Sequence, residues 1–136
     1  MQNQVTAHTD ERRPVASILV IDDEEAVRGL FRAILEPLGY RIVEARDGLD
    51  GLSRYREAPT DLVITDMSMP RGDGLEVIRT LRADFPTLRI LAVSGAERPD
   101  ESTEALRMGA TAMLSKPVGV NELRTAVAHC LLDRAG

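Results

Sequence analysis

Short apolar runs alternate along this chain with longer segments of helical period, and this alternation constrains the fold more than any other feature. We expect each run, rich in β-branched residues, to form a β-strand. Parallel neighbouring strands need crossover connections, which helices supply, so the pattern favours an α/β fold with a parallel sheet covered on both faces. The five runs are Ser17–Ile21, Arg41–Ala45, Asp61–Thr65, Leu88–Val93 and Thr111–Leu114.

The segments between the runs carry the apolar spacing of amphipathic helices. After the first run, Pro37 and Gly39 are placed to end such a helix. Shorter stripes predict helices at 48–56 and 99–108, the first capped by Asp47 and the second closed by Gly109. The longer stripes consist of Val27, Leu30, Phe31, Ile34, Leu35 and Leu38; of Leu75, Ile78 and Leu81; and of Val120, Leu123, Val127, Cys130 and Leu131.

Size and composition indicate one ordinary globular domain. The 136 residues are 43% hydrophobic and 29% charged, and the net charge of -5 disfavours direct nucleic-acid binding. The single cysteine, Cys130, excludes an internal disulfide and favours a reducing compartment, which predicts a cytoplasmic protein. We expect residues 1–14 to form a flexible tail without a signal peptide, and residues 15–134 to form the domain, with no output domain and no membrane segment.

Polar residues follow four of the five predicted strands. Asp22 and Asp23 come after the first, Asp66 after the third, Ser94 after the fourth and Lys116 shortly after the fifth. Ligands of a parallel sheet bind at the carboxyl ends of its strands, so we expect these side chains to converge. Three neighbouring carboxylates repel one another unless a cation intervenes, and their oxygens suit Mg²⁺ or a similar ion such as Mn²⁺.

Asp66 is the candidate nucleophile, because a carboxylate can attack phosphorus to form an acyl phosphate. Lys116 and Ser94 could then contact the phosphoryl oxygens, and Pro117 could hold the Lys116–Pro117 bond in the cis form. Simpler interpretations exist for each residue. Asp66 could be a loop aspartate, Asp23 a helix cap, Ser94 part of a turn, and Lys116 a surface lysine beside a turn proline.

Four motifs in order favour the functional interpretation, and together they resemble the receiver domain of two-component response regulators. They are ILVIDDEEAVR, DLVITDMSMPRGDGLEVIR, ILAVSGAE and GATAMLSKP. The resemblance implies a flavodoxin-like, doubly wound fold with strand order 2-1-3-4-5. It also implies that Asp66 accepts a phosphoryl group from a histidine kinase or phosphotransfer protein, that Asp22, Asp23, Asp66 and the backbone carbonyl of Ser68 hold Mg²⁺, and that Ser94 and Lys116 sense the phosphoryl group.

The resemblance further implies a phosphoprotein that signals by changing its binding surface for a downstream effector protein. The expected protein is a monomer or weak dimer that assists its own phosphorylation and dephosphorylation without being a dedicated enzyme. Met113 departs from the family, which usually has an aromatic switch residue there. This departure supports one alternative, a phosphorylation-independent pseudo-receiver. A second alternative, an aspartate-nucleophile phosphatase, usually needs an aspartate where this chain has Ser68.

Overall fold

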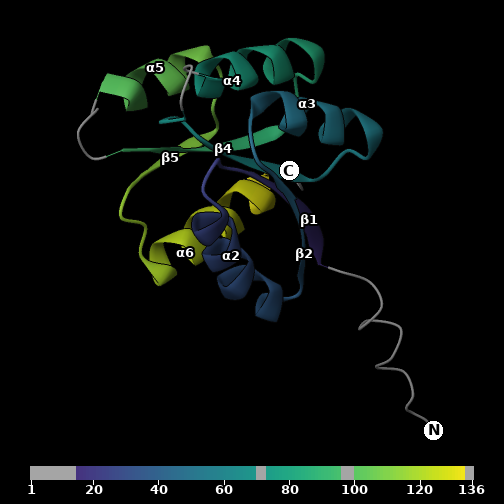
Figure 1. The fold of residues 1–136 in the computed structure, drawn as a ribbon, viewed down its shortest axis with the longest axis vertical. Coiled ribbons are helices and arrows are strands. Elements are labelled where there is room, and N and C mark those ends of the chain that lie inside the picture. The colour runs from purple at the N-terminus through teal and green to yellow at the C-terminus, as the bar shows by residue number, and fades with distance from the viewer. Residues whose placement is uncertain (1–14, 70–72, 96–99, 134–136) are drawn as a thin grey trace, which may run out of the picture.

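The protein is described here by a computed structural model that covers residues 15–69, 73–95 and 100–133 (Figure 1). The predicted tail at 1–14 therefore lies outside the described residues. Strands and helices alternate as expected, and a 3₁₀ turn, η2, follows the first helix. The elements are β1 (Ala16–Ile21), α2 (Glu25–Leu35), η2 (Glu36–Leu38), β2 (Tyr40–Ala45), α3 (Gly48–Glu57), β3 (Leu62–Asp66), α4 (Asp73–Asp84), β4 (Arg89–Ser94), α5 (Asp100–Met108), β5 (Ala112–Ser115) and α6 (Val120–Asp133).

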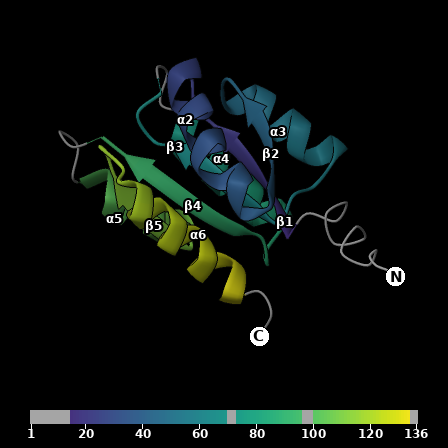
Figure 2. The same ribbon diagram turned by 90° about the horizontal axis from the view of Figure 1, so that it is seen from below.

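The five strands form one parallel sheet with the order β2-β1-β3-β4-β5, which confirms the predicted topology. Their arrows point toward the same edge of the sheet (Figure 2). The chain leaves β1 toward β2 on one side and later returns to place β3 on the other side of β1. The loops after β1 and β3 therefore diverge, and a crevice at such a switch point is where α/β sheets bind ligands.

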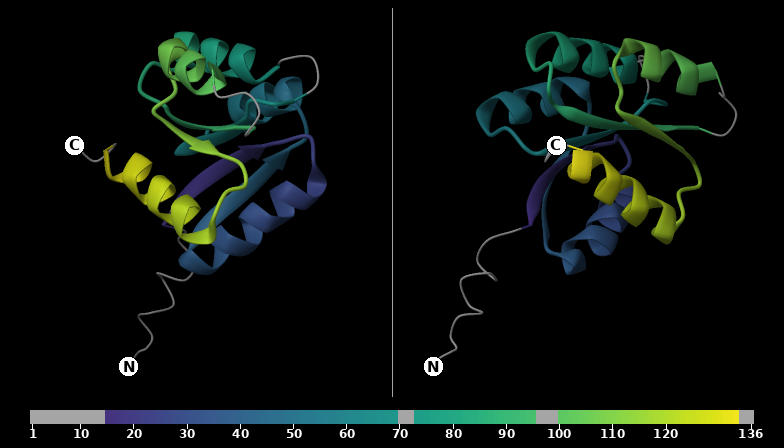
Figure 3. Two further views of the ribbon diagram at one scale, coloured as in Figure 1. Left: turned by 90° about the vertical axis from the view of Figure 1, so that its left-hand side faces the viewer. Right: turned by 180° about the vertical axis from the view of Figure 1, so that it is seen from behind.

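Each face of the sheet has its own hydrophobic core. Helices α3, α4 and α5 cover one face, and α2 and α6 cover the other (Figures 1 and 3). Alternate residues of a strand point to opposite faces, so Leu19 and Ile21 of β1 belong to the first core while Ile18 and Val20 belong to the second. Among the described residues, no helix has both the length and the apolar character needed to cross a membrane.

The helix boundaries follow the predicted signals. Helix α2 ends at Leu35, and Gly39, with a φ of 101°, follows the 3₁₀ turn that contains Pro37. The Asp47 carboxylate accepts a hydrogen bond from the Asp50 amide at 2.8 Å, as expected of an N-cap. Gly109, with a φ of 120°, follows α5 as predicted.

The strand ends differ by one residue from the prediction. Asp66 and Ser94 are the last residues of β3 and β4 and do not follow them. The ladder extends this far because Asp66 pairs with Val93, and the next amide, that of Met67, donates to the Val93 carbonyl at 2.8 Å. As a result, the backbone that carries both polar side chains is held by sheet hydrogen bonds, which fix its position more firmly than a loop would.

The predicted apolar stripes are wider than the faces that the helices bury. Phe31, Ile34 and Leu35 of α2 are buried as expected. Leu30 and Leu38, by contrast, are 50% and 43% exposed, and Val120 at the start of α6 is 46% exposed. The spacing predicted an apolar helix face that includes these three residues, and the structure leaves them about half exposed. Periodicity shows which side of a helix is apolar, but the neighbouring elements decide how much of that side is covered.

Candidate functional site

The structure brings the predicted carboxylates together at the carboxyl edge of the sheet. One carboxylate oxygen from each of Asp22, Asp23 and Asp66 lies within 4.8 Å of the others. Asp22 and Asp66 are each only 3% exposed, whereas Asp23 is exposed. The expected convergence of the residues after β1 with the end of β3 is confirmed.

Backbone amides orient the two buried carboxylates. The Glu24 amide donates to Asp22 Oδ1 at 2.9 Å, and the Ser68 amide donates to Asp66 Oδ1 at 3.1 Å. Each donor lies two residues beyond its acceptor, a local turn that aspartate favours. An amide of the loop after β1 thus fixes the direction of the Asp22 carboxylate, and an amide of the loop after β3 fixes that of Asp66.

Lys116, which directly follows β5, reaches the same group of carboxylates. Its amide donates to the Ser94 carbonyl at 2.8 Å, and its bond to Pro117 is cis, as predicted. The Nζ atom lies 3.4 Å from Asp66 Oδ1 and 3.5 Å from Asp22 Oδ2. Burial lowers the pKa of the Lys116 ammonium, but the nearby carboxylates of Asp22 and Asp66 outweigh burial, and the pKa is raised. Lys116 therefore stays charged at neutral pH.

Burial disfavours the ionised form of the Asp22 carboxyl. Its pKa is raised from 3.8 to about 6, mainly because burial removes the side chain from water. The amide of Glu24 and the ammonium of Lys116 act against this shift, while the negative charges of Asp66 and Asp23 add to it. A divalent cation would reverse the balance, because it stabilises the ionised form.

The pKa of Asp22 gives a prediction for pH. A carboxyl whose pKa is raised in the folded state favours folding when protonated, so the metal-free protein should become more stable as pH falls from about 7.5 to about 5.5. The whole difference between 3.8 and about 6 corresponds to at most about 3 kcal/mol, of which only about 1 kcal/mol is gained by about pH 5.5 and the rest at lower pH. Thermal unfolding should show this trend, and Asp22→Asn should raise the midpoint of the metal-free protein at neutral pH and flatten the trend.

Magnesium should reverse that pH trend. Its ligands must be ionised, so the increase in unfolding midpoint that Mg²⁺ causes near neutral pH should fade as pH falls through about 6, the raised pKa of Asp22. The Asp22→Asn protein should show little increase at any pH. A metal-free protein that loses stability between about pH 7.5 and about pH 5.5 would contradict this account of Asp22.

The remaining predicted residues lie around the carboxylates. Ser94 ends β4 and is 1% exposed, and Met113 of the neighbouring strand pairs with Ala92 and is partly buried against the core. Ser68 is exposed, and its Oγ accepts a hydrogen bond from the Gly95 amide at 3.1 Å. This bond links the loop after β3 to the loop after β4. The roles of Ser94 and Met113 as a switch, and of the Ser68 carbonyl as a metal ligand, stay predictions.

A pocket of about 700 Å³ opens beside these residues. Part of its wall is polar and includes Asp66 and Lys116, and the rest is apolar and comes from α2 and from the residues after Lys116. Leu30 lines this pocket, although its spacing along the chain indicated only that it lies on an apolar helix face. The lining residues are Asp23, Glu24, Val27, Leu30, Phe31, Asp66, Ser68, Gly95, Lys116, Pro117 and Val118.

The donor set fits a hard divalent cation. Three carboxylates within 4.8 Å face one nearby ammonium, that of Lys116, which leaves net negative charge at the edge of the sheet. Oxygen ligands of this kind are those that Mg²⁺ and Mn²⁺ prefer. Asp22, Asp23 and Asp66 could therefore hold such a metal.

Comparison with known proteins agrees with this geometry. Residues 18–128 match the family model described as response regulator receiver domain. The KDP operon transcriptional regulatory protein KdpE of Escherichia coli is 36% identical over 110 residues, which are 81% of this chain and 48% of KdpE. The transcriptional regulatory protein ZraR of Klebsiella oxytoca is 32% identical over 114 residues, which are 84% of this chain and 26% of ZraR.

A solved structure of similar size shares the fold. The response regulator receiver domain protein from Clostridium thermocellum superposes with a TM-score of 0.84 at 30% identity, and the match covers 89% of this chain and 98% of that one. The chain spans less than half the length of KdpE and ZraR. The shared part is thus one domain of those regulators.

Proposed function

The chain belongs to the response regulator receiver domain family of two-component systems, and on that basis we propose that it is a phosphorylation switch in which Asp66 accepts the phosphoryl group. The observation that carries this proposal is the meeting of Asp22, Asp23, Asp66 and Lys116 at one edge of the sheet. A carboxylate nucleophile beside a metal-binding pair and a fixed ammonium has what phosphoryl transfer to aspartate requires.

In the proposed mechanism, Asp66 attacks the phosphorus of the donor with a carboxylate oxygen, and the leaving group departs on the opposite side. The Ser68 amide, bonded to Asp66 Oδ1, keeps the carboxylate in a fixed direction. Lys116 lies close enough to neutralise charge on a transferred oxygen. Asp22 and Asp23, with the Ser68 carbonyl, would hold Mg²⁺, whose contribution is to offset the negative charge of the phosphoryl group.

The intact mass of the protein after incubation with acetyl phosphate tests this function. We expect one added phosphoryl group in the presence of Mg²⁺ and none when the metal is chelated. Asp66→Asn should show no addition, because the amide is not a nucleophile, while its fold should persist. Absence of any addition to the unaltered protein would instead favour the pseudo-receiver, and steady hydrolysis of small phosphate esters would favour the phosphatase.

We propose that the phosphoryl donor is a histidine kinase or phosphotransfer protein, which would reach Asp66 through the pocket beside α2. Val27, Leu30 and Phe31 supply an apolar surface next to the acceptor. Leu30 is half exposed, and a partner that covers this side chain would gain binding free energy from its burial. The chain would then serve as phosphoacceptor and promote the transfer, and it would not be a dedicated enzyme.

The role of the pocket can be tested with Leu30→Asp. Burying a new carboxylate against an apolar partner is costly, so transfer from a protein donor should slow by roughly tenfold or more. Phosphorylation by acetyl phosphate should change by less than about twofold. Exposed Leu49 on α3 offers a matched control, and Leu49→Asp should leave both rates unchanged. Equal loss with both donors would show that Leu30 acts on the chemistry and not on docking.

We propose that phosphorylation changes the protein-binding surface formed by α5, β5 and α6. Ser94 pairs with Ser115 across β4 and β5, and Met113 lies on the same strand as Ser115. A phosphoryl group beside Ser94 adds charge and acceptor oxygens, which bias nearby groups between two arrangements. The downstream effector would read that surface.

A further inference from the structure

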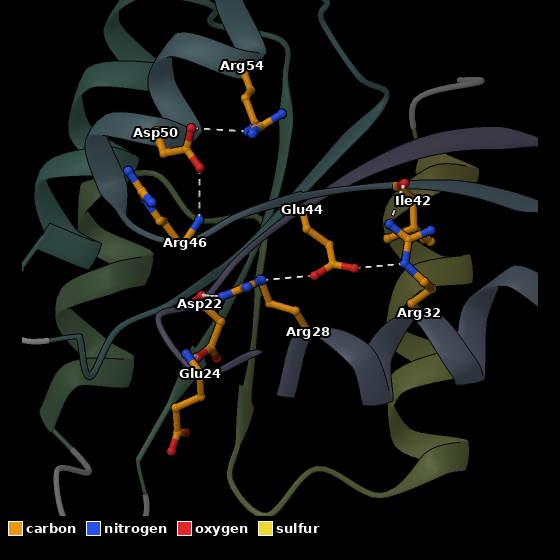
Figure 4. A network of polar contacts seen from close by, with 9 residues as sticks. All are labelled: Asp22, Glu24, Arg28, Arg32, Ile42, Glu44, Arg46, Asp50 and Arg54. Carbon is orange, nitrogen blue, oxygen red and sulfur yellow. Dashed lines mark hydrogen bonds and ion pairs between the residues drawn. The ribbon is translucent and has the colours of Figure 1, made fainter. Parts of the chain in front are cut away.

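Arg28 of α2 connects the acidic loop after β1 to a carboxylate on β2 (Figure 4). Its Nη1 donates to the carbonyl oxygen of Asp22 at 2.7 Å, and its Nε donates to Glu44 Oε1 at 2.9 Å. The side chains of Arg28 and Glu44 are 15% and 26% exposed, so water screens this pair only partly. The guanidinium group of Arg28 thus bridges the acidic loop after β1 and strand β2.

The same loop is tied to β2 through the other backbone group of Asp22. The Asp22 amide donates to the Ala45 carbonyl at 3.1 Å, and Ala45 directly follows Glu44. Both backbone polar groups of Asp22 are therefore bonded to β2, one directly and one through Arg28. Because the Asp22 side chain extends from this backbone, its direction depends on both bonds.

Glu44 is held from a second side by Arg32. Arg32 Nε donates to Glu44 Oε2 at 2.8 Å, and its Nη2 donates to the Ile42 carbonyl at 3.3 Å. Arg32 is also hydrogen-bonded to Glu36, the first residue of η2. The hydrogen bond from Arg32, aided by that from Arg28, holds the pKa of Glu44 below its usual value. Glu44 is thus a fixed anion that accepts from two arginines of α2.

Arg28 and Arg32 both bind Glu44, but they differ in their other contacts. Arg28 and Arg32 both connect α2 to β2 through Glu44, but only Arg28 also bonds Asp22. The bond between Arg32 and Glu44 is sufficient to attach α2 to the sheet. The contact of Arg28 with the Asp22 carbonyl adds a connection to the loop that carries the metal-binding carboxylates.

We propose that Arg28, held in place by Glu44, is a positioning residue that fixes the acidic loop for divalent cation binding. Arg28 itself contacts neither the cation nor the phosphoryl group. It holds the Asp22 backbone so that the carboxylates of Asp22 and Asp66 stay in the arrangement that a cation needs. Outer groups of this kind commonly set the affinity of a metal site through the ligands that they orient. The inference rests on the proposed function only in taking the cation as Mg²⁺.

Mg²⁺ binding to the full, unphosphorylated chain, measured by calorimetry, tests this role. We expect Arg28→Met to weaken binding about tenfold, the lower end of what the loss of such an outer group costs, and Glu44→Gln to weaken it less. Arg32→Met is the matched control, because it removes the same charge and a bond to the same carboxylate without touching Asp22. Its dissociation constant should change by less than about twofold, although its unfolding midpoint should fall as much as that of Arg28→Met.

Amide hydrogen exchange of the metal-free protein gives a second readout. The Glu24 amide is bonded to Asp22 Oδ1, so a loosened loop should expose it. We expect faster exchange at Glu24 in Arg28→Met and Glu44→Gln, and unchanged exchange in Arg32→Met. Equal effects of Arg28→Met and Arg32→Met on both readouts would overturn the proposal. If the unaltered chain binds no Mg²⁺, the proposed function fails, and exchange at Glu24 still decides whether Arg28 positions the loop.

Discussion

Replacing Lys116 with glutamine is expected to slow the phosphorylation of Asp66 by acetyl phosphate by about 100-fold or more at saturating Mg²⁺. Removal of one fixed charge or donor from developing negative charge commonly costs that much. Lys116 is suited to this role because its Nζ lies 3.4 Å from Asp66 Oδ1. Its backbone amide donates to the Ser94 carbonyl, which fixes the backbone of Lys116 at the end of the sheet. The initial rate of phosphoryl addition, followed by intact mass, measures the effect.

A second variant separates charge from position. Lys116→Arg keeps the positive charge but carries it on a larger, planar group, so the rate should fall less than in Lys116→Gln but not reach that of the unaltered protein. In Lys116→Gln the pKa of Asp22 should rise further, because the ammonium that lowers it is gone. If Lys116→Gln is phosphorylated at a normal rate, Lys116 serves only to neutralise the carboxylates of the resting protein.

The architecture could be predicted from sequence because its signals are local. Five apolar runs and the helical periods between them indicated the parallel sheet, and the strand-end rule then placed Asp22, Asp66 and Lys116 at one edge. The same local signals identified the cap at Asp47 and the close of α5 at Gly109. Each of these features depends on residues close together along the chain or on a general property of parallel sheets.

The features that the sequence did not reveal depend on contacts between distant residues. Glu44 contacts Arg28 and Arg32 only because β2 and α2 are packed together. The separations of 16 and 12 residues along the chain do not predict these two contacts. The exposure of Leu30 similarly depends on its neighbours in space, and Leu30 lines a pocket together with Pro117 and Val118. The last residue of β3 is set by its ladder with β4, which placed Asp66 inside the strand.

Gly74 is a further feature that depends on a contact between elements distant in the sequence. It lies in the first turn of α4, where the helix backbone approaches the end of β3 closely. A Cβ atom at this position would lie 2.7 Å from the Asp66 carbonyl oxygen and 2.7 Å from Met67 Cα. Both neighbours are backbone atoms that are tied to the sheet, so neither can move aside as a flexible side chain would.

Gly74→Ala is therefore expected to lower the free energy of unfolding by about 2 kcal/mol, as overpacking of a close contact typically does. It should also slow phosphorylation of Asp66 by acetyl phosphate, because relief of the clash must move either α4 or the acceptor. Gly29→Ala is the matched control, since a Cβ on this exposed position of α2 would meet nothing within 4 Å.

That control should gain roughly 0.5 to 1 kcal/mol, because alanine favours a helix over glycine, and its phosphorylation rate should not change. Urea unfolding and intact mass would measure both variants. If Gly74→Ala is as stable and as rapidly phosphorylated as the unaltered chain, α4 can yield without disturbing Asp66. The close approach of helix and strand would then not be what holds the acceptor in place.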